Sequence, residues 1–301
     1  MGHVIQTHSA TALVSRTRSR VREQLCRMPL PRVSAQDLRL LGPGKMLRTR
    51  FAARLHEEAS LPVRSDCLTD ACVAVELVHT ASLCHDDVID GAQVRRAAPA
   101  LWRRVGPSAA VLVGDMLLCE AIGTIIGGPA RQYGEAFLAR IREMCLVESE
   151  HEMSLLGRRL EPDTCVRLAR GKTGALFAFL GLVCGGEDEP LAGALQEVGY
   201  RIGAAYQLAD DLLDRTGDEE VAGKTLGSDA ARGKFTLPQS DAGTLLTQER
   251  MVRLCEESLN DLLGWPGARA ALESFLIRDL DPPLSRLVPS LGLARRLGLR
   301  P

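Results

Sequence analysis

Helical periodicity dominates the pattern of hydrophobic and polar positions along the chain. Residues 67–90 (CLTDACVAVELVHTASLCHDDVID) run without glycine or proline and are apolar through most of their length, which exceeds a usual helix of a globular protein. Ser65 and Asp66 can cap the start of this segment, and Gly91 stands where a helix commonly ends. The sequence therefore predicts a long, largely buried helix that ends at Gly91.

A second long segment covers residues 190–216. Pro190 stands at the favoured first helical position, and Gly217 follows the last turn. The same periodicity predicts further helices over 107–127, 130–157, 162–184, 246–263 and 267–279. No convincing strand, repeat or long linker is present in the pattern. We therefore expect one all-α domain over residues 1–301, with short loops between mostly antiparallel helices and a frayed N-terminus over 1–25.

Composition narrows the class of protein. The 301 residues are 46% hydrophobic and 25% charged, with a formal net charge of −1 and 4% aromatic residues. A chain without net positive charge creates no field that attracts phosphate backbones, so a nucleic-acid binder is disfavoured. The longest apolar stretch, 173–186, is shorter than the roughly 20 residues that a membrane-spanning helix needs. We expect no membrane span.

The nine cysteines are scattered and odd in number, and no pair has CxxC spacing. They are typical of small core residues in a reducing compartment, so we expect a cytoplasmic protein without disulfides or a zinc site. The first 22 residues contain no acid and include Arg16, Arg18 and Arg20. We interpret them as a basic terminus, and a transit peptide is the alternative.

Lysine is rare in this chain. Of the 37 basic residues only four are lysine: Lys45, Lys172, Lys224 and Lys234. A lysine ammonium is a compact point charge that suits a single phosphate oxygen, whereas arginine presents a planar fork. The alternative is that these four lysines have no common function. Their positions relative to the other motifs decide between a phosphate-binding role and this alternative.

Two clusters of aspartate stand near the ends of the two longest helices. Both have the pattern DDxxD: Asp86, Asp87 and Asp90 in one, and Asp210, Asp211 and Asp214 in the other. Positions i and i+4 share one helix face, so like charges repel there, and carboxylates at a helix C-terminus oppose the helix dipole by about 0.3–1 kcal/mol each. Upstream residues are apolar, and buried carboxylates without compensation are unfavourable.

A bound divalent cation would offset the charge repulsion, the helix dipole and the cost of burying these carboxylates. Aspartate oxygens are hard ligands, and Mg²⁺ binds to one or two carboxylates together with substrate phosphates and water. A single DDxxD is a weak signal, but two at matching helix ends indicate a magnesium site.

Basic residues surround both aspartate clusters. Five candidates precede or follow the first cluster and three accompany the second: Lys45, Arg48, His79, Arg95 and Arg96, then Lys172, Lys224 and Lys234. All four lysines thus lie close to a motif or a glycine-bounded loop. Metal-bridging carboxylates with separate cations suit two polyanionic substrates, one held through Mg²⁺ and the other directly.

From about residue 41 to 238 the sequence resembles the trans-isoprenyl diphosphate synthases of the polyprenyl synthetase family. The motifs that carry the resemblance are 42-GPGKMLR-48, 76-ELVHTASLCHDDVIDGAQVRR-96, 113-VGD-115, 172-KTGALF-177, 207-QLADDLLD-214 and 223-GKTLGSD-229 followed by GKFTLP. The resemblance implies an isoprenoid synthase-type helical bundle around a central cavity, and a homodimer.

The resemblance also implies a role for each candidate residue. Four positions match those that hold isopentenyl diphosphate: Lys45, Arg48, His79 and Arg96. Four match positions on the allylic diphosphate: Arg95, Lys172, Lys224 and Lys234. Thr173 and Gln207 match positions near the reacting carbons, and the six aspartates match the ligands of three Mg²⁺ ions.

The implied reaction condenses isopentenyl diphosphate with an allylic diphosphate into a longer all-trans polyprenyl diphosphate. Mg²⁺ and cations would make the allylic diphosphate a leaving group, and no side-chain nucleophile is needed. Two alternatives stay open: a class I terpene cyclase on the same fold, which typically has one aspartate motif, and a non-catalytic regulatory subunit, which usually lacks one. This chain keeps both motifs and most of an isopentenyl-binding set.

Several positions depart from the family pattern. Met46 stands where arginine is usual, Ala97 where glycine is usual, and Trp102 where histidine is common. For product length, Ser82 and Ala81 lie four and five positions before Asp86, where an aromatic residue in the family stops elongation. Because both are small, we expect an open tunnel and a product of C20 or longer. The alternative is a floor from another helix, near Leu118 or Phe177.

Overall fold

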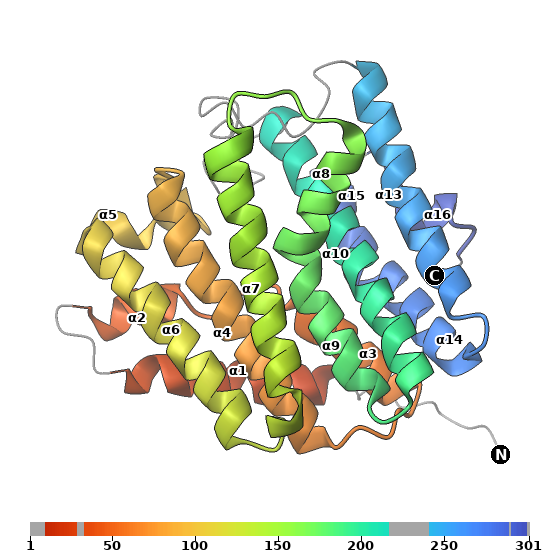
Figure 1. The fold of residues 1–301 in the computed structure, drawn as a ribbon, viewed down its shortest axis with the longest axis horizontal. Coiled ribbons are helices and arrows are strands. Elements are labelled where there is room, and N and C mark those ends of the chain that lie inside the picture. Colours follow the sequence, from red (N-terminus) through yellow and green to blue (C-terminus); the bar gives the residue numbers. More distant parts are fainter. Residues whose placement is uncertain (1–9, 29–32, 217–240, 289, 300–301) are drawn as a thin grey trace.

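A computed structural model describes residues 10–28, 33–216, 241–288 and 290–299 of the chain. Long helices run roughly alongside one another and form a bundle, with shorter helices across its ends and sides (Figure 1). Lys224 and Lys234 lie outside the described residues.

The first half of the chain begins with three helices that lead into the longest element of this half. The elements are α1 (Ala10–Arg27), α2 (Ala35–Leu40), α3 (Leu47–Glu58), α4 (Ser65–Ile89), β1 (Val94–Arg95), β2 (Ala98–Pro99), α5 (Leu101–Val105), α6 (Pro107–Gly127), the 3₁₀ turn η1 (Arg131–Tyr133) and α7 (Gly134–Glu150).

The described residues of the second half include three π-helical segments, η2, η3 and η4, each continuous with an α-helix. The elements are η2 (His151–Leu155), α8 (Pro162–Ala169), η3 (Arg170–Gly174), α9 (Ala175–Gly185), α10 (Glu189–Thr216), α13 (Asp241–Asp261), α14 (Pro266–Phe275), η4 (Leu276–Leu280), α15 (Asp281–Leu287) and α16 (Leu293–Arg296).

Helix α4 lies in the middle of the core. Every residue from Cys67 to Val78 is buried, because α1, α3, α6 and α9 all pack against this helix. A helix that is apolar on all sides is stable in water only when other helices cover all of its faces. The aspartates at its C-terminal end are therefore carried by one of the most enclosed elements of the fold.

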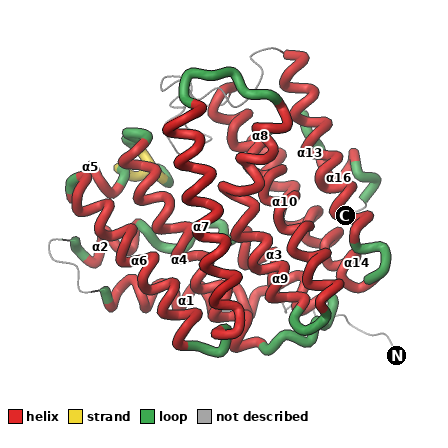
Figure 2. The backbone as a smooth tube through the Cα atoms, in the orientation of Figure 1, coloured by secondary structure: helices red, strands yellow, loops and turns green. Residues whose placement is uncertain are grey.

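The all-α prediction is confirmed, with one small exception. Strands β1 and β2 form a two-residue antiparallel hairpin, drawn yellow among the red helices in Figure 2. Its turn residues, Arg96 and Ala97, have φ angles of 54° and 57°. Two positive φ angles are the signature of a type I′ turn, which glycine favours. Ala97 adopts this conformation at a steric cost of about 1–2 kcal/mol.

The expectation of a frayed N-terminus over 1–25 is wrong for residues 10–25. They belong to α1, whose Leu13, Val21 and Leu25 are buried against the core. Arg20 of this helix pairs with the buried Asp70 of α4. The segment is therefore an integral part of the bundle.

Glycines allow α9 and α10 to pack with their backbones in contact. A Cβ added at Gly181 would lie 2.1 Å from the Leu195 carbonyl oxygen, and one at Gly185 would lie 2.3 Å from Ala192 Cα. Neither distance is possible for a real side chain. These glycines therefore serve the close packing of the two helices.

Three helical segments are long and apolar enough to cross a membrane by length and composition: Ser65–Ile89, Pro107–Gly127 and Pro162–Gly185. Each of these segments contains charged residues, so none of them is an uninterrupted apolar run in the sequence. Two of these segments are 83% buried inside the bundle, whereas Pro107–Gly127 is 33% buried. The absence of a membrane span stays a prediction.

The C-terminal helices close the bundle against α3. Asp279 of η4 is 4% exposed at its side chain and accepts hydrogen bonds from Arg54 Nε at 2.7 Å and Arg50 Nη1 at 3.2 Å. Arg50 Nε also donates to the Lys45 carbonyl oxygen at 3.1 Å. The C-terminal region is thus linked to the loop that precedes α3.

Candidate active site

A cavity of about 770 Å³ opens between α3, α4, α7, η3 and α10. It brings together most of the residues that the sequence predicts for the site. Those that line it are Lys45, Arg48, His79, Asp86, Asp90, Arg95, Arg96, Lys172, Thr173, Gln207, Asp210 and Asp214.

The first aspartate cluster is placed by the C-terminal end of α4. The Asp90 N–H donates to the Asp86 carbonyl at 2.7 Å, Gly91 has a φ of 65°, and the Ala92 N–H returns to the Asp87 carbonyl at 3.0 Å. This is the Schellman ending that glycine allows. Asp86 and Asp90 lie one turn apart on the face that borders the cavity.

The middle aspartates of the two motifs do not line the cavity. Asp87 is 3% exposed and accepts hydrogen bonds from Arg95 at 2.9 and 2.5 Å. Burial raises the pKa of Asp87, and Arg95 opposes this rise. Asp211 accepts a hydrogen bond from Gln207 Nε2 at 2.8 Å. One position along a helix turns a side chain off the shared face, so a metal-ligand role for these two residues stays a prediction.

Lys172 projects from η3 toward two carboxylates. Its Nζ lies 2.7 Å from Glu148 Oε2 of α7 and 3.8 Å from Asp86 Oδ2. Burial alone would lower the pKa of Lys172, but Asp86 and Glu148 raise it well above its ordinary value. The ammonium is therefore charged at every physiological pH.

Thr173 and Gln207 form a hydrogen-bonded chain on the same side of the cavity. The Thr173 hydroxyl donates to Gln207 Oε1, whose amide in turn donates to Asp211. Each of these side chains is held in one orientation. The neighbouring Tyr206 also lines the cavity, and burial, with Asp210, raises its pKa to about 12.

Arg48 lies at the cationic wall with an incomplete set of partners. Its guanidinium carbon is 5.4 Å from the centre of the Phe177 ring, and its buried Nε has no hydrogen-bond acceptor among the described residues. Burial lowers the pKa of Arg48, although the carboxylate of Glu76 opposes the shift. A buried cation that the protein itself satisfies poorly indicates an anionic ligand.

His79 borders Arg48 on the cavity wall. Burial lowers its pKa well below the ordinary value, and Arg48, Arg96 and Arg95 add to the effect. The imidazole is therefore neutral at pH 7 and gains a proton only when an anion offsets the neighbouring cations.

Arg96 is held by the loop before α3. Its guanidinium donates to the Gly42 carbonyl oxygen. A Cβ at Gly44 would lie 3.0 Å from Arg96 Nη2, so glycine lets this loop approach the arginine. Met46, the residue that departs from the family pattern, lines the same part of the cavity and is 3% exposed. An apolar side chain therefore stands in this wall beside Lys45 and Arg48.

The 113-VGD-115 motif supports the histidine beside the first aspartate. His85 Nε2 lies 3.2 Å from Asp115 Oδ1 and 3.2 Å from the Val111 carbonyl oxygen. A Cβ at Gly114 would come within 2.3 Å of the ring. Glycine at this position therefore makes room for His85.

The donor set fits a magnesium ion that is completed by substrate. Among the described residues, no three His, Cys, Asp or Glu side chains lie close enough to hold an ion by themselves. Two cavity-lining aspartates come from α4 and two from α10, and Arg95 lies within electrostatic reach of both Asp86 and Asp210. Mg²⁺ usually takes one or two carboxylates together with phosphate oxygens and water.

Sequence reasoning missed three carboxylates that line the cavity, Glu76, Glu148 and Glu152, and misplaced one wall residue. Glu148 pairs with Lys172, and Glu76 is 3% exposed and accepts the Thr49 hydroxyl at 2.7 Å. Glu76 has no acidic neighbour at helical spacing, whereas Glu148 and Glu152 stand four positions apart, which is a signal that sequence reasoning could have used. Ala81 is fully buried and does not line the cavity, whereas Ser82 does.

The apolar part of the cavity wall comes from several helices. Its side chains include Val78, Leu118, Ile141, Met144 and Phe177. The alternative that α6 and α9 contribute to the floor, through Leu118 and Phe177, therefore fits the structure. α4 does not form this wall alone.

Comparison with known proteins gives a consistent result. The model of the polyprenyl synthetase family matches residues 35–260. Geranylgeranyl diphosphate synthase of Mycobacterium tuberculosis is 35% identical over 56% of this chain and 51% of its own. A short chain isoprenyl diphosphate synthase of Methanothermobacter thermautotrophicus is 34% identical over 72% of this chain and 69% of its own. The chain thus spans about half to two thirds of these relatives.

Solved structures resemble the fold over nearly its full length. Geranyltranstransferase of Thermotoga maritima superposes with a TM-score of 0.71 and 27% identity, covering 92% of this chain and 98% of its own. A polyprenyl synthase of Caulobacter crescentus, solved with calcium and isoprenyl diphosphate, gives a TM-score of 0.68 and 25% identity over 95% and 96%. From its motifs, its fold and these matches, this chain belongs to the polyprenyl synthetase family.

Proposed function

We propose that this protein is a Mg²⁺-dependent prenyltransferase that condenses isopentenyl diphosphate with an allylic diphosphate. The product is a longer all-trans polyprenyl diphosphate. The observation that carries the proposal is the lining of one cavity. It combines carboxylates from two helix ends, a separate set of cationic side chains and a group of apolar side chains. These are the parts that two diphosphates and a growing hydrocarbon require.

The allylic diphosphate would lie beside Lys172 and the cavity-lining aspartates. Bound Mg²⁺ supplies charge neutralisation of the diphosphate, which makes it a better leaving group. Asp86, Asp90, Asp210 and Asp214 would hold the Mg²⁺ ions. We propose three ions in the site, the number that the family resemblance implies. Lys172 is already charged and directed into the cavity, so it can stabilise the departing diphosphate without reorganisation.

Isopentenyl diphosphate would bind at the wall formed by Lys45, Arg48, His79 and Arg96. Arg48 is poorly satisfied by the protein, and Lys45 is exposed at the cavity border. Charge-assisted bonds from these groups to phosphate contribute about 1.5–3 kcal/mol each. His79 would take up a proton as the second diphosphate enters, because the anion offsets the neighbouring arginines.

In the proposed reaction the C1–O bond of the allylic substrate breaks and diphosphate leaves. The isopentenyl double bond attacks C1 to form the new carbon–carbon bond, and a proton passes to the released diphosphate. The chain's own residues bind and orient the two substrates. Thr173 and Gln207 have fixed orientations in the cavity wall and would present oxygen dipoles toward the developing cation.

The product is proposed to be C20 or longer. Ser82 and Val78 are small or medium-sized and leave the cavity open between α4 and the side chains of Leu118, Ile141 and Met144. The curated relatives bear names of synthases with different product lengths, so the wall residues of this chain carry the argument.

A second copy of the chain is proposed to cover α6 and α7. α6 is only 33% buried over its apolar window, and Leu112 and Ile126 are 60% and 50% exposed. Leu138 and Leu146 of the adjacent α7 are 44% and 59% exposed. An apolar patch of this kind on a helix pair is typical of a protein interface. We also propose a cytoplasmic location, which nine free cysteines support.

The test is incubation of the protein with isotopically labelled isopentenyl diphosphate, a C10 or C15 allylic diphosphate and Mg²⁺. Elongated linear diphosphates support the proposal. A cyclised hydrocarbon formed from the allylic substrate alone would favour a terpene cyclase. Tight substrate binding without turnover would favour a regulatory subunit, although the presence of both aspartate motifs argues against it.

A further inference from the structure

Lys172 and Thr173 are carried by a π-helical turn that is pressed against α10. A Cβ added at Gly174 would lie 2.6 Å from the Tyr200 carbonyl oxygen, and one at Gly203 would lie 2.4 Å from Gly174 Cα. The backbones of η3 and α10 therefore touch. π-helical turns are rare and are frequent at functional sites, so a turn of this kind needs contacts that hold its register.

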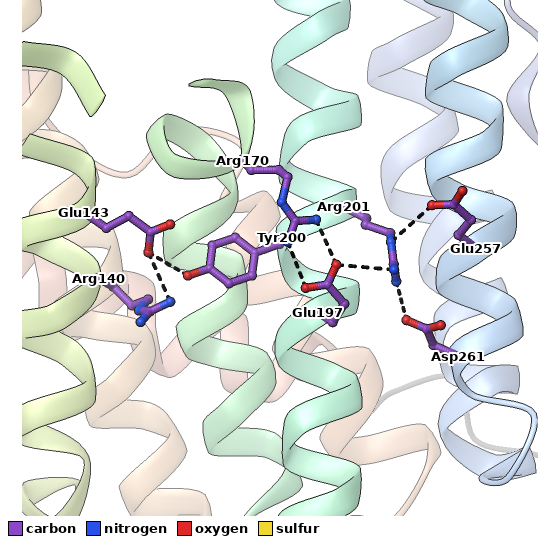
Figure 3. Close-up of polar contacts among 8 residues, drawn as sticks. All are labelled: Arg140, Glu143, Arg170, Glu197, Tyr200, Arg201, Glu257 and Asp261. Carbon is purple, nitrogen blue, oxygen red and sulfur yellow. Dashed lines mark hydrogen bonds and ion pairs between the residues drawn. The ribbon is translucent and has the colours of Figure 1, made fainter. Parts of the chain in front are cut away.

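Arg170 opens η3 and forms a two-pronged ion pair with α10. Its Nη1 and Nη2 lie 2.8 Å from Glu197 Oε1 and 2.8 Å from Oε2, respectively. The guanidinium carbon also lies 4.9 Å from the centre of the Tyr200 ring (Figure 3). A fork of this geometry fixes the direction of the arginine as well as its distance from the carboxylate.

Tyr200 connects this fork to α7. Its hydroxyl donates to Glu143 Oε2 at 2.6 Å, and Arg140 binds the same carboxylate at 3.1 Å. The Arg140 guanidinium carbon lies 5.5 Å from the Tyr200 ring centre, so the ring contacts two cations (Figure 3). A cation over an aromatic face is attracted by the negative face of the ring.

Glu197 is held from its other side by Arg201. The Arg201 Nη2 lies 3.3 Å from Glu197 Oε1, and the same guanidinium pairs with Glu257 at 3.3 Å and with Asp261 (Figure 3). Burial alone would raise the pKa of Glu197, but Arg170 and Arg201 keep it below its ordinary value. The carboxylate that receives Arg170 is therefore charged, and it is held by Arg201, which is itself paired with two carboxylates of α13.

Arg170 and Lys172 leave the helix in nearly opposite directions. Two positions along a helix rotate a side chain by roughly 200° in α geometry. Accordingly, Arg170 pairs with Glu197, whereas Lys172 lines the cavity and pairs with Glu148 and Asp86. A rotation of η3 that released the first contact would displace the second.

We propose that Arg170, locked by Glu197 and Tyr200, is a positioning residue that sets where Lys172 and Thr173 stand in the cavity. This inference rests on the proposed function for its consequence in turnover. The group touches no substrate, and its effect passes through the register of η3. A displacement of about 1 Å at a binding group can lower turnover by about 100-fold.

The experiment compares Arg170→Met, Arg170→Lys and Glu197→Gln with the matched control Arg167→Met. Arg167 forms a similar two-pronged pair with Glu150 at 2.8 and 2.7 Å, but it stands on α8 and outside η3. Inorganic diphosphate with Mg²⁺ serves as the probe in titration calorimetry. Steady-state kinetics are measured with each diphosphate substrate varied, and circular dichroism checks the fold.

We expect Arg170→Met and Glu197→Gln to bind inorganic diphosphate at least about fivefold more weakly and to lose about 10- to 100-fold in kcat. The KM for isopentenyl diphosphate should stay within twofold, because Lys45, Arg48, His79 and Arg96 come from elements other than η3. Arg170→Lys should recover part of the loss, and Arg167→Met should match the wild type.

The inference is overturned if Arg170→Met keeps wild-type diphosphate affinity, or if it raises both KM values to the same extent and lowers the Tm. A merely structural role would give the latter result. A wild-type protein that binds diphosphate but elongates no prenyl chain refutes the proposed function. In that case the calorimetric difference between Arg170→Met and Arg167→Met still decides the positioning role.

Discussion

Two arginines of α3 should respond in opposite ways to the same substitution. Arg54 and Arg48 stand on one helix, six positions apart. Arg54 is 14% exposed at its side chain and pairs with Glu58 and with the buried Asp279. Arg48 has its Nε unsatisfied and contacts a phenylalanine ring. Methionine keeps most of the apolar length of either side chain and removes the charge.

The magnitudes follow from these contacts. Removal of one partner from a buried ion pair costs about 3–5 kcal/mol. Because Arg50 still reaches Asp279 at 3.2 Å, we expect Arg54→Met to lose about 2–3 kcal/mol and several degrees in Tm. For Arg48→Met, the loss of the ring contact, about 1–2 kcal/mol, offsets the relief of a poorly satisfied buried donor, about 1–3 kcal/mol. Stability should be unchanged or rise by about 1 kcal/mol.

The KM for isopentenyl diphosphate should change strongly in Arg48→Met and little in Arg54→Met, which reverses the order expected for stability. A lost charge-assisted bond of about 1.5–3 kcal/mol predicts an increase of roughly 10- to 150-fold in the KM of Arg48→Met for isopentenyl diphosphate. Arg54→Met should keep the wild-type KM. Thermal unfolding and steady-state kinetics at saturating allylic diphosphate measure both effects. A fall of several degrees in the Tm of Arg48→Met would refute the reasoning, because Arg48 would then be satisfied by the protein itself.

Three further predictions concern the two subsites and the wall. Lys45→Ala should mainly raise the KM for isopentenyl diphosphate, and Lys172→Ala that for the allylic substrate; the reverse pattern would refute the assignment. Ser82→Phe should shorten the product in a chromatographic assay, whereas Ala81→Phe should destabilise the fold by overpacking the core; an unchanged Ser82→Phe product would exclude this wall. The folded state disfavours protonation of His79. As the pH is lowered below about 6.5, the free energy of unfolding of the wild type should therefore fall by about 1 kcal/mol per pH unit more than that of His79→Gln. Equal slopes for the two proteins would contradict this.

The long helices could be predicted from sequence because their apolar positions recur at the helical period. The predicted 107–127 coincides with α6, and 190–216 begins one residue after α10 does. α1 was missed although Leu13, Thr17, Val21 and Leu25 recur at spacings of four and are all buried. The many arginines between these positions hid a regular buried stripe.

The hairpin could not be predicted because each strand has two residues and its turn lacks glycine. A type I′ turn is normally announced by Asn-Gly or Gly-Gly, and this chain has Arg96 and Ala97. Its conformation is imposed by tertiary contacts, among them the hydrogen bond from Trp102 Nε1 to the Ala92 carbonyl at 2.7 Å.

Within the site, the sequence identified residue types well and their directions less well. The i, i+4 rule placed Asp86 with Asp90 on the face that borders the cavity, but it could not show that Asp87 turns toward Arg95. Ala81 and Ser82 differ by about 100° around α4, so only Ser82 of these two predicted wall positions lines the cavity, and Ala81 belongs to the core. The π-helical turn at 170–174 has no local sequence signal, and the network around Arg170 depends on it.

The central claim is that carboxylates from α4 and α10 act together on one diphosphate. The most direct measurement is turnover with isopentenyl diphosphate and an allylic diphosphate for wild type, Asp86→Ala and Asp210→Ala, each with and without Mg²⁺. We predict elongation by wild type that requires Mg²⁺, a loss of at least about 100-fold in each variant, and little change in the Tm of either variant in metal-free buffer, since each substitution also relieves repulsion. Undiminished turnover in either variant, or turnover that persists in a chelator, would contradict the account.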